Sequence, residues 1–354
     1  MTGLPDVLTE NPDRCPGCPK APRNSQVNAD TLSEVLQAVR LTGAVFFDVE
    51  ASEPWVAEAL PAKSIASAIL PDCEHVMEYH VITSGSCWAS VIGHDIAPVR
   101  LQAGDVVAFP QGDAHILSSA PGMRGEAGPD VAALMESDPQ VPVLFNLDGG
   151  GSARAHVVCG FLGCDSRPFN PLIEALPPIL HIPSSGTAHS SWLKEFTRFA
   201  VMEANEKRMG ASTILSKLGE LMFAELVRRY VESLPEESRG WLGGLRDRTV
   251  GRALNLMHTE PTRDWTLNQL AKESGLSRSA FAERFSAYVG IPPMQYLQKW
   301  RLQIAASRLL GSGAGIAAIA ADVGYESEAA FSRAFKRVIG QSPADWRDVR
   351  MNSK

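Results

Sequence analysis

The sequence predicts a multidomain α+β protein, with a β-rich amino-terminal domain, a helical connector and an all-α carboxy-terminal domain. Three observations support this class. Short apolar runs separated by Gly, Pro and Asp fill the stretch from Ala44 to His181, which is typical of an antiparallel sandwich or barrel. Apolar residues then recur at helical spacing towards the end of the chain. The carboxy-terminal third contains one helical pattern twice.

The composition is that of a globular protein with room for two domains and a connector. Of the 354 residues, 45% are hydrophobic and 21% charged, an ordinary balance for a folded protein. No run of about eighteen apolar residues occurs, and the first residues lack a basic segment followed by an apolar core, so we expect neither a membrane span nor a signal peptide. The six cysteines are best explained as cytosolic thiols rather than a disulfide framework.

The formal net charge of −7 conceals an asymmetry. Residues 245–354 contain 16 Lys and Arg against 10 Asp and Glu, whereas residues 1–244 contain 17 against 30. The carboxy-terminal part is therefore basic by +6 and the remainder acidic by −13. A basic domain at the end of an acidic chain favours contact with a polyanion, although surface variation alone could produce the smaller of these charges.

The amino-terminal half begins with a segment rich in Pro, Asn and Asp, which predicts a flexible tail over residues 1–26. The β-rich domain is predicted over residues 27–185. It opens with a helix, because apolar residues recur at helical spacing after Asp30, a suitable N-cap. The candidate strands that follow are AVFFDV, SIASAIL, EYHVIT, CWASVIG, VVAFP, HILSS, VPVLFNL and AHVVCGFL. The segment APGMRGEAGPDVAALMESDPQ predicts a surface loop.

Residues 186–240 predict a helical connector between the two domains. Two stretches, Trp192–Asn205 and Ile214–Val231, show the periodicity of a helix. The second presents one apolar stripe, formed by Ile214, Leu218, Leu221, Met222, Leu226 and Val227. We expect that stripe to be buried against the β-rich domain, against a second copy of the connector, or against both.

The carboxy-terminal domain, residues 245–350, carries the repeated pattern. The first copy is LNQLAKESGLSRSAFAERFSAYVGIPP and the second is IAAIAADVGYESEAAFSRAFKRVIGQSP. Each has an alanine four residues before a glycine, then two phenylalanines four apart, then a second glycine and a proline. The copies are joined by one further helix, and they predict helix-turn-helix motifs over residues 266–290 and 315–340.

Elementary physics explains each position of the repeat. Gly275 and Gly324 can take the positive φ that a turn between two helices requires. Ser277 and Ser327 can cap the second helix of each motif. Phenylalanines at i and i+4 share one face, which predicts that they anchor that helix in the core. The opposite face then points outward.

The outward faces carry small, hydroxyl, acidic and basic side chains. They are Arg278, Ser279, Ala282 and Glu283 in the first copy, and Glu328, Ala329, Ser332, Arg333 and Lys336 in the second. A helix of this width fits the major groove of duplex DNA, where Arg pairs with guanine and Glu with cytosine. For one copy alone, a solvated helical hairpin would be the favoured explanation. Two copies in register, in the basic part of the chain, favour DNA binding.

This region resembles the DNA-binding domain of the AraC/XylS family of bacterial transcription regulators. The resemblance covers Leu245 to Arg350 and is most specific in WRLQIAASRLL and IAAIAADVGYESEAAFSRAFKRVIGQSPADWR. It implies a homodimer in the bacterial cytoplasm, at the nucleoid, that activates transcription with RNA polymerase and places its two motifs in successive major-groove segments.

The same resemblance implies which residues contact bases. They are Ser279, Ala282 and Glu283 in the first motif, and Glu328, Ala329, Ser332 and Arg333 in the second. The first motif has smaller residues than the more polar members of that family. We therefore expect DNA shape and phosphate contacts to contribute more there than base contacts do.

The segment GDVVAFPQGDAH, from Gly104 to His115, resembles the second motif of the cupin jelly roll, specifically the sensor domain that precedes AraC-type DNA-binding domains. The resemblance implies that His115 points into the barrel. The first cupin motif is degraded. In EHVMEYHVITSG, His75 and His80 are five residues apart and so on opposite faces of a strand, whereas Glu78 and His80 share a face.

The barrel residues leave three explanations open: a metal held by Glu78, His80 and His115, a pocket that binds an effector without a metal, or an ordinary core. We expect no cofactor and an effector pocket formed by Glu78, His80, Cys87 and His115, because the three-histidine site of metal-dependent cupins is incomplete. The effector is a small molecule or an oxidant that acts on cysteine. The CPGC motif at residues 15–18 is weak evidence for zinc, because no second pair follows.

Three functions compete. The sequence favours a transcription regulator that binds double-stranded DNA, responds to a small molecule or oxidant, and is not an enzyme. The alternative is a cupin-type metalloenzyme, a dioxygenase or isomerase, with an appended DNA-binding module, and the incomplete metal triad argues against it. The tandem repeat argues against a helical scaffold without a DNA role.

Overall fold

The computed structural model describes residues 30–71, 73–125, 143–184 and 208–351, with isolated positions between 195 and 206. The strands are β1 (Thr42–Ser52), β2 (Val56–Ala59), β3 (His75–Ser84), β4 (Ser86–Val91), β5 (Val99–Gln102), β6 (Val106–Phe109), β7 (His115–Ser118), β8 (Val143–Asp148), β9 (Arg154–Cys164) and β10 (Leu180–Ile182). The helices before the carboxy-terminal domain are α1 (Thr31–Ala38), the 3₁₀-helix η1 (Ala62–Ser64), α2 (Ala66–Ile69), α4 (Pro171–Ala175) and α6 (Ala211–Ser233). The remaining helices are α7 (Gly240–Arg246), α8 (Arg248–Thr259), α9 (Leu267–Glu273), α10 (Arg278–Val289), α11 (Pro293–Gly311), α12 (Ile316–Asp322), α13 (Glu328–Ile339) and α14 (Pro343–Met351).

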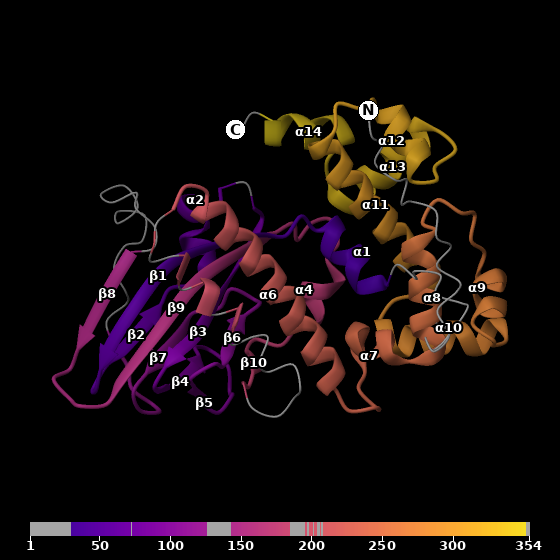
Figure 1. Cartoon of the computed structure of the whole chain (residues 1–354). Helices are drawn as coiled ribbons and strands as arrows, with labels where there is room; N and C mark the ends of the chain where they lie inside the picture. Colours follow the sequence, from indigo (N-terminus) through magenta and orange to yellow (C-terminus); the bar gives the residue numbers. More distant parts are fainter. Residues whose placement is uncertain are drawn as a thin grey trace, which may run out of the picture.

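The strands form two sheets, which lie together at one end of the molecule (Figure 1). The larger has the order β10-β6-β3-β9-β1-β8 and the smaller the order β2-β7-β4-β5. Apolar side chains of both sheets, among them Val49, Ile82, Leu117 and Val157, pack into one core between them. The β-rich amino-terminal domain that the sequence predicts is confirmed, and so is the all-α carboxy-terminal domain.

One predicted strand is wrong. The run SIASAIL forms the end of η1 and helix α2. Ile65 and Ile69 are four residues apart and both buried, so the run buries one face of a helical turn rather than alternate residues of a strand. The predicted first helix is confirmed as α1, where the Asp30 carboxylate accepts a hydrogen bond from the Ser33 backbone N–H at 2.9 Å.

Helix α6 packs against the outer face of the larger sheet, across β1 and β9 (Figure 1). Its buried side chains Leu215, Met222, Phe223, Leu226 and Val227 share a core with the sheet. Gly43 of β1 permits the close approach, because a Cβ there would lie 2.5 Å from the Ser216 carbonyl oxygen. The predicted apolar stripe is too wide: Ile214 and Leu221 are 38% and 52% exposed.

The carboxy-terminal helices divide between two cores. Trp241, Phe285 and Trp300, from α7, α10 and α11, belong to the core that α6 and the outer sheet face also share. Phe331 and Phe335 of α13 belong to a second core, formed by α11 to α14. The first helix-turn-helix motif is therefore continuous with the packing of the β-rich domain, whereas the second has a core of its own, joined to the first through α11.

Some predicted features lie outside the described residues. They are the tail at 1–26 with its CPGC motif, most of the surface loop at 120–140, and most of the helical stretch Trp192–Asn205. Among the helices that the structure describes, none combines the length and the apolar composition needed to cross a lipid bilayer.

Candidate nucleic-acid interface and internal cavity

Both helix-turn-helix motifs have the local structure that the sequence predicts. Gly275 and Gly324 lie in the turns with φ of +75° and +79°, a conformation that L side chains adopt only with strain. The hydroxyl oxygens of Ser277 and Ser327 accept hydrogen bonds from backbone N–H groups three residues further on, at 3.4 and 3.2 Å. These contacts satisfy donors that the first turn of a helix leaves free, and so fix where α10 and α13 begin.

The inner faces of α10 and α13 are anchored by aromatic pairs. Phe281 and Phe285 of α10, and Phe331 and Phe335 of α13, have no solvent exposure. The ring centroids within each pair lie 5.8 and 5.4 Å apart. Because residues four apart share one helix face, these pairs determine which face of each helix is left for solvent.

The outer faces of the two helices are open. Of the side chains predicted to contact DNA, those exposed to solvent are Arg278, Ser279, Glu283, Glu328, Ala329, Arg333 and Lys336. Ala282 and Ser332 are partly exposed. The arrangement is sterically compatible with a helix entering the major groove, and the individual base contacts stay a prediction.

The arginines of this domain fall into two groups. Arg284 pairs with Asp247, the N-cap of α8, at 2.5 Å, and Arg301 donates to three backbone carbonyls at 2.6, 2.8 and 3.4 Å. These two stabilise the fold. Arg278 and Arg333, by contrast, have no ion pair or hydrogen bond with another described side chain. Their guanidinium groups, on the outer faces, are available to a partner.

A cavity of about 410 Å³ lies between the two sheets of the β-rich domain. Its wall is mostly apolar and includes Phe47 of β1, Leu117 of β7 and Phe145 of β8. Its strongly polar lining residues are Glu58, Glu78, His80 and His115. A mostly apolar chamber with a few convergent polar groups is typical of a small-molecule site.

Glu78 and His80 of β3 meet His115 of β7 at this cavity. Their exposures are 6%, 4% and 1%, and a potential ligand atom from each lies within 4.8 Å of the others. The Nε2 atoms of the two histidines are 2.7 Å apart, and Glu78 Oε2 is 3.6 Å from His115 Nε2. Phe109 stacks on His115, with centroids 3.7 Å apart. His115 therefore points into the barrel, as the cupin resemblance implies.

Burial keeps the side chains of Glu78, His80 and His115 uncharged at neutral pH. It raises the pKa of Glu78 to about 8 and lowers the pKa of His115 to about 4. It also lowers the pKa of His80, which the neighbouring His115 lowers further. The contact between Glu78 and His115 is therefore not an ion pair at neutral pH. Glu78 Oε1 and His80 Nδ1 are buried without a hydrogen-bond partner in the described part of the chain.

The structure places Cys87 outside the lining of the cavity, against the prediction, and puts Cys159 of β9 there instead. Cys87 lies on β4, where its side chain points into the core between the sheets. Burial raises the pKa of Cys87 to about 12, and raises the pKa values of Cys159 and Cys164 above their usual range. Because the thiolate is the reactive form of cysteine, these three thiols are poor sites for oxidation.

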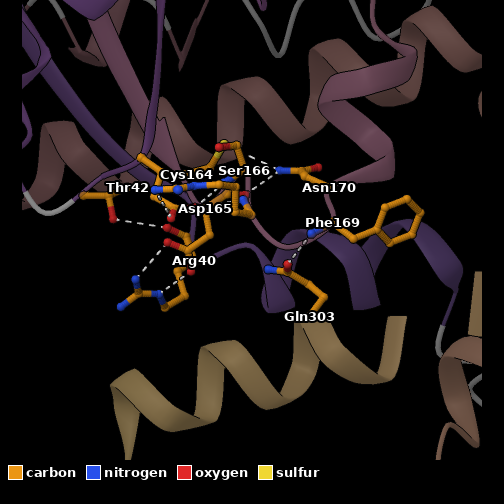
Figure 2. A network of polar contacts seen from close by, with 10 residues as sticks. Arg40, Thr42, Cys164, Asp165, Ser166, Phe169, Asn170 and Gln303 are labelled. Atoms are coloured by element: carbon orange, nitrogen blue, oxygen red, sulfur yellow. Dashed lines mark hydrogen bonds and ion pairs between the residues drawn. The ribbon is translucent and has the colours of Figure 1, made fainter. Parts of the chain in front are cut away.

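A polar network joins the end of β9 to helix α11 (Figure 2). Arg40 donates to both carboxylate oxygens of Asp165 at 2.7 and 2.8 Å, and Asn170 Nδ2 donates to the Asp165 backbone carbonyl at 2.8 Å. Further along the same segment, the Phe169 backbone N–H donates to Gln303 Oε1 at 3.0 Å. Residues 165–170 therefore connect the β-rich domain directly to the helix that both helix-turn-helix motifs share.

Aromatic contacts reinforce this junction. The Phe169 ring meets the Tyr296 ring at 5.4 Å, edge to face, and Lys299 Nζ lies 5.1 Å from the Phe169 centroid. Strand β9, which leads into the junction, also carries Cys159 and Phe161, two residues of the cavity wall. Strand β9 thus lines the cavity, and the segment that follows it in the chain contacts α11.

Sequence reasoning missed the junction. Arg40 and Asp165 are 125 residues apart, and Phe169 and Gln303 are 134 apart, so no local pattern connects them. The one available signal is Gln303, a polar residue inside the apolar run WRLQIAA, which is fully buried. A buried amide on an apolar helix face indicates a hydrogen-bond partner from elsewhere.

Comparison with known proteins gives matches over both parts of the chain. A family model described as a cupin matches residues 30–232, and one described as a helix-turn-helix domain matches residues 270–348. An AraC-like transcription regulator of Streptomyces lividans is 33% identical over 286 residues, which are 79% of this chain and 89% of that protein. The HTH-type transcriptional regulator AlkR of Acinetobacter baylyi is 27% identical over 319 residues, 90% of this chain and 99% of the relative. The RCS-specific HTH-type transcriptional activator RclR of Escherichia coli K12 is 27% identical over 276 residues, 77% of this chain and 84% of the relative.

Proposed function

Because the chain belongs to the AraC family of transcription regulators and its amino-terminal domain is a cupin, we propose that it activates transcription from operators bound by α10 and α13 in successive major-groove segments. The observation that carries this proposal is the pair of helices anchored by Phe281, Phe285, Phe331 and Phe335, with the opposite face of each open. The guanidinium groups of Arg278 and Arg333, which pair with no side chain in the described part of the chain, suit contacts with guanine or phosphate.

The proposal that this chain activates transcription rests on one of its relatives. This relative, RclR, is named an activator, which supports activation, and therefore contact with RNA polymerase, as the function of this chain. We further propose that it acts as a homodimer at the bacterial nucleoid. The exposed Ile214 and Leu221 of α6 are apolar residues that a second copy of the connector would cover.

The cavity of the cupin domain is proposed as the effector site. Its volume and its mostly apolar wall suit a small molecule, and the raised pKa values of Cys87 and Cys159 favour such a molecule over an oxidant that acts there. The metalloenzyme alternative is not favoured, because the relatives are named as regulators of transcription.

The first test is a genome-wide binding profile of the tagged protein, followed by affinity measurements on the operator it defines. Arg333→Ala is expected to weaken operator binding by about 1–3 kcal/mol, because a bidentate contact between arginine and guanine contributes about that much. Binding to random DNA is expected to change much less, since the lost contact carries sequence information.

Arg252→Ala is the matched control for this variant. Arg252 lies on α8, where its guanidinium pairs with Glu273 at 3.3 Å and is largely exposed. Its removal is expected to leave the ratio of operator to random affinity unchanged. An equal loss on both DNAs for Arg333→Ala would reassign Arg333 to a phosphate.

We propose that effector binding is transmitted along β9 and residues 165–170 to α11, in addition to the connector α6. An effector alters DNA affinity only if it binds two states of the protein unequally. Phe161 at the cavity wall and Phe169 at α11 lie on one continuous segment, which is a short physical path between the two sites. The close contact of α6 with β1 supplies the second path.

Gln303→Ala is expected to loosen this junction. The substitution leaves the Phe169 backbone N–H buried without its acceptor, a loss of about 1–3 kcal/mol. Hydrogen–deuterium exchange of the segment around Phe169 is therefore expected to become faster by about fivefold to more than a hundredfold. Gln295→Ala on the exposed face of the same helix is the control. Unchanged exchange in Gln303→Ala would rule out this contact as the link.

A further inference from the structure

We propose that Arg167 is a positioning residue for DNA recognition. It bridges Glu74 of the cupin domain and Trp346 of α14, and so holds the second helix-turn-helix motif in one orientation relative to the first. That orientation sets the spacing of operator segments that the protein accepts. The inference rests on the proposed function, because it requires that α10 and α13 bind one operator, and it concerns a contact separate from the hydrogen bond between Phe169 and Gln303.

The second motif needs a restraint outside its own core. Its buried residues, among them Ile319, Phe331 and Phe335, pack within α11 to α14 and are separate from the core of the first motif. Units of one chain that share a small interface move relative to one another by default. A contact between the second motif and the cupin domain, away from α11, would limit that motion. Helix α14 is placed for such a contact, since it extends from this core back over the cupin domain (Figure 1).

Arg167 is attached to the cupin domain through Glu74, which directly precedes β3. The Glu74 side chain is 5% exposed, and its Oε2 accepts hydrogen bonds from the backbone N–H groups of Ser166 and Arg167 at 3.1 and 2.8 Å. Glu74 Oε1 lies 3.2 Å from Arg167 Nη2. The carboxylate thus holds both the backbone and the guanidinium of Arg167, and fixes the direction of a long side chain that would otherwise sample many rotamers.

The Arg167 guanidinium also faces α14. Its Cζ atom lies 5.8 Å from the centroid of the Trp346 ring, within the range of a cation–π interaction. Trp346 is 3% exposed and meets the Phe335 ring edge to face at 6.0 Å, so its indole is fixed in the core of the second motif. The Arg167 side chain is 64% exposed, and a cation–π contact at an exposed site changes an equilibrium by about two- to fivefold.

The geometry of duplex DNA turns this restraint into selectivity for spacing. Successive major-groove segments on one face are one helical turn apart, about 10–10.5 base pairs. One inserted base pair moves the second segment by about 3.4 Å along the axis and rotates it by about 35°. A motif held in one orientation follows that change only by breaking a contact, whereas a loosely attached motif follows it freely. Arg167 therefore makes the protein more selective for one spacing.

The experiment measures the affinity of the full-length protein for its operator and for the same operator with one base pair inserted between the two segments. The ratio of the two affinities reports the selectivity for spacing. In Arg167→Ala we expect this ratio to fall by about two- to fivefold, because the insertion no longer breaks the contact with Trp346. Arg167→Lys keeps a cation near the ring and is expected to have a ratio closer to that of the parent. A role in stability alone would weaken binding to both operators equally.

Arg124→Ala is the matched control. Arg124 is also 64% exposed and also pairs with a largely buried glutamate of the cupin domain, Glu58, at 2.8 Å. It is expected to keep the parental ratio. An unchanged ratio in Arg167→Ala, or a parent that binds both spacings equally, would overturn the positioning role. Random DNA tested on the same samples decides the proposed function separately: a parent that prefers its operator to random DNA keeps that function whatever the ratio, and a parent without this preference contradicts both.

Discussion

Phe335→Ala is expected to destabilise the second helix-turn-helix motif by about 3–5 kcal/mol, the usual loss for truncating a fully buried phenylalanine. Phe335 has no solvent exposure, and its ring lies 5.4 Å from Phe331 and 6.0 Å from Trp346. These residues belong to the separate core of α11 to α14. The loss should therefore concentrate in that core, and operator binding should fail with it while the cupin domain stays folded.

The measurement is hydrogen–deuterium exchange of α12 and α13 in the full-length protein. A loss of 3–5 kcal/mol corresponds to exchange faster by about two to nearly four orders of magnitude through local opening. Val338→Ala, on the same helix but 37% exposed, should change stability by about 0.5 kcal/mol or less. Equal effects of the two substitutions would show that the phenylalanine face of α13 is not its core side.

Tyr296→Phe is expected to destabilise the junction of α7, α8 and α11 by about 2–6 kcal/mol, although it removes a single oxygen. The Tyr296 hydroxyl accepts from Trp241 Nε1 and donates to His258 Nε2, each at 2.7 Å. Burial lowers the pKa of His258 to about 3, so the imidazole is neutral and accepts. Removing the hydroxyl leaves two buried polar groups without partners, at about 1–3 kcal/mol each.

Urea unfolding of the full-length protein measures this loss. Tyr288→Phe is the control, because its hydroxyl has no hydrogen bond with another described residue, while its ring contacts Arg239 and Arg284. The Tyr288→Phe variant should unfold at nearly the same urea concentration as the parent protein. The core around Tyr296 also includes residues of α6 and the sheet. We therefore expect Tyr296→Phe to lower the stability of the cupin domain as well, and an effect confined to α7, α8 and α11 would contradict the shared core.

The helix-turn-helix motifs were predictable nearly residue by residue, because their determinants are local. The turn glycine, the N-cap serine and the buried phenylalanine pair of each motif lie within a few residues of one another, and each acts through its own backbone or helix face. Gly324, Ser327 and Phe331 illustrate this, since positive φ, capping and burial all follow from the spacing. The run SIASAIL was mistaken for a strand because a short apolar run lacks enough residues to show its period.

The cavity was predictable only in part. Glu78 and His80 share a strand face because they are two residues apart, and the structure places both at the cavity. His115 reaches them from the other sheet, a pairing that only the cupin resemblance suggested. Cys87, which the sequence placed in the effector pocket, lies instead in the packed core between the sheets, outside the lining of the cavity. The junction between Phe169 and Gln303 depends on the relative position of two domains, which no local pattern encodes.

The central claim is that α10 and α13 recognise two successive major-groove segments of one operator. The measurement is the affinity of the full-length protein for the operator and for two variants of it, each with the base pairs under one helix scrambled. We predict that scrambling either segment weakens binding, more strongly under α13, where Arg333 and Glu328 are exposed, than under α10 with its smaller side chains. We also predict that Arg333→Ala removes most of the loss caused by scrambling the α13 segment. Unchanged affinity after scrambling the α13 segment would contradict the account.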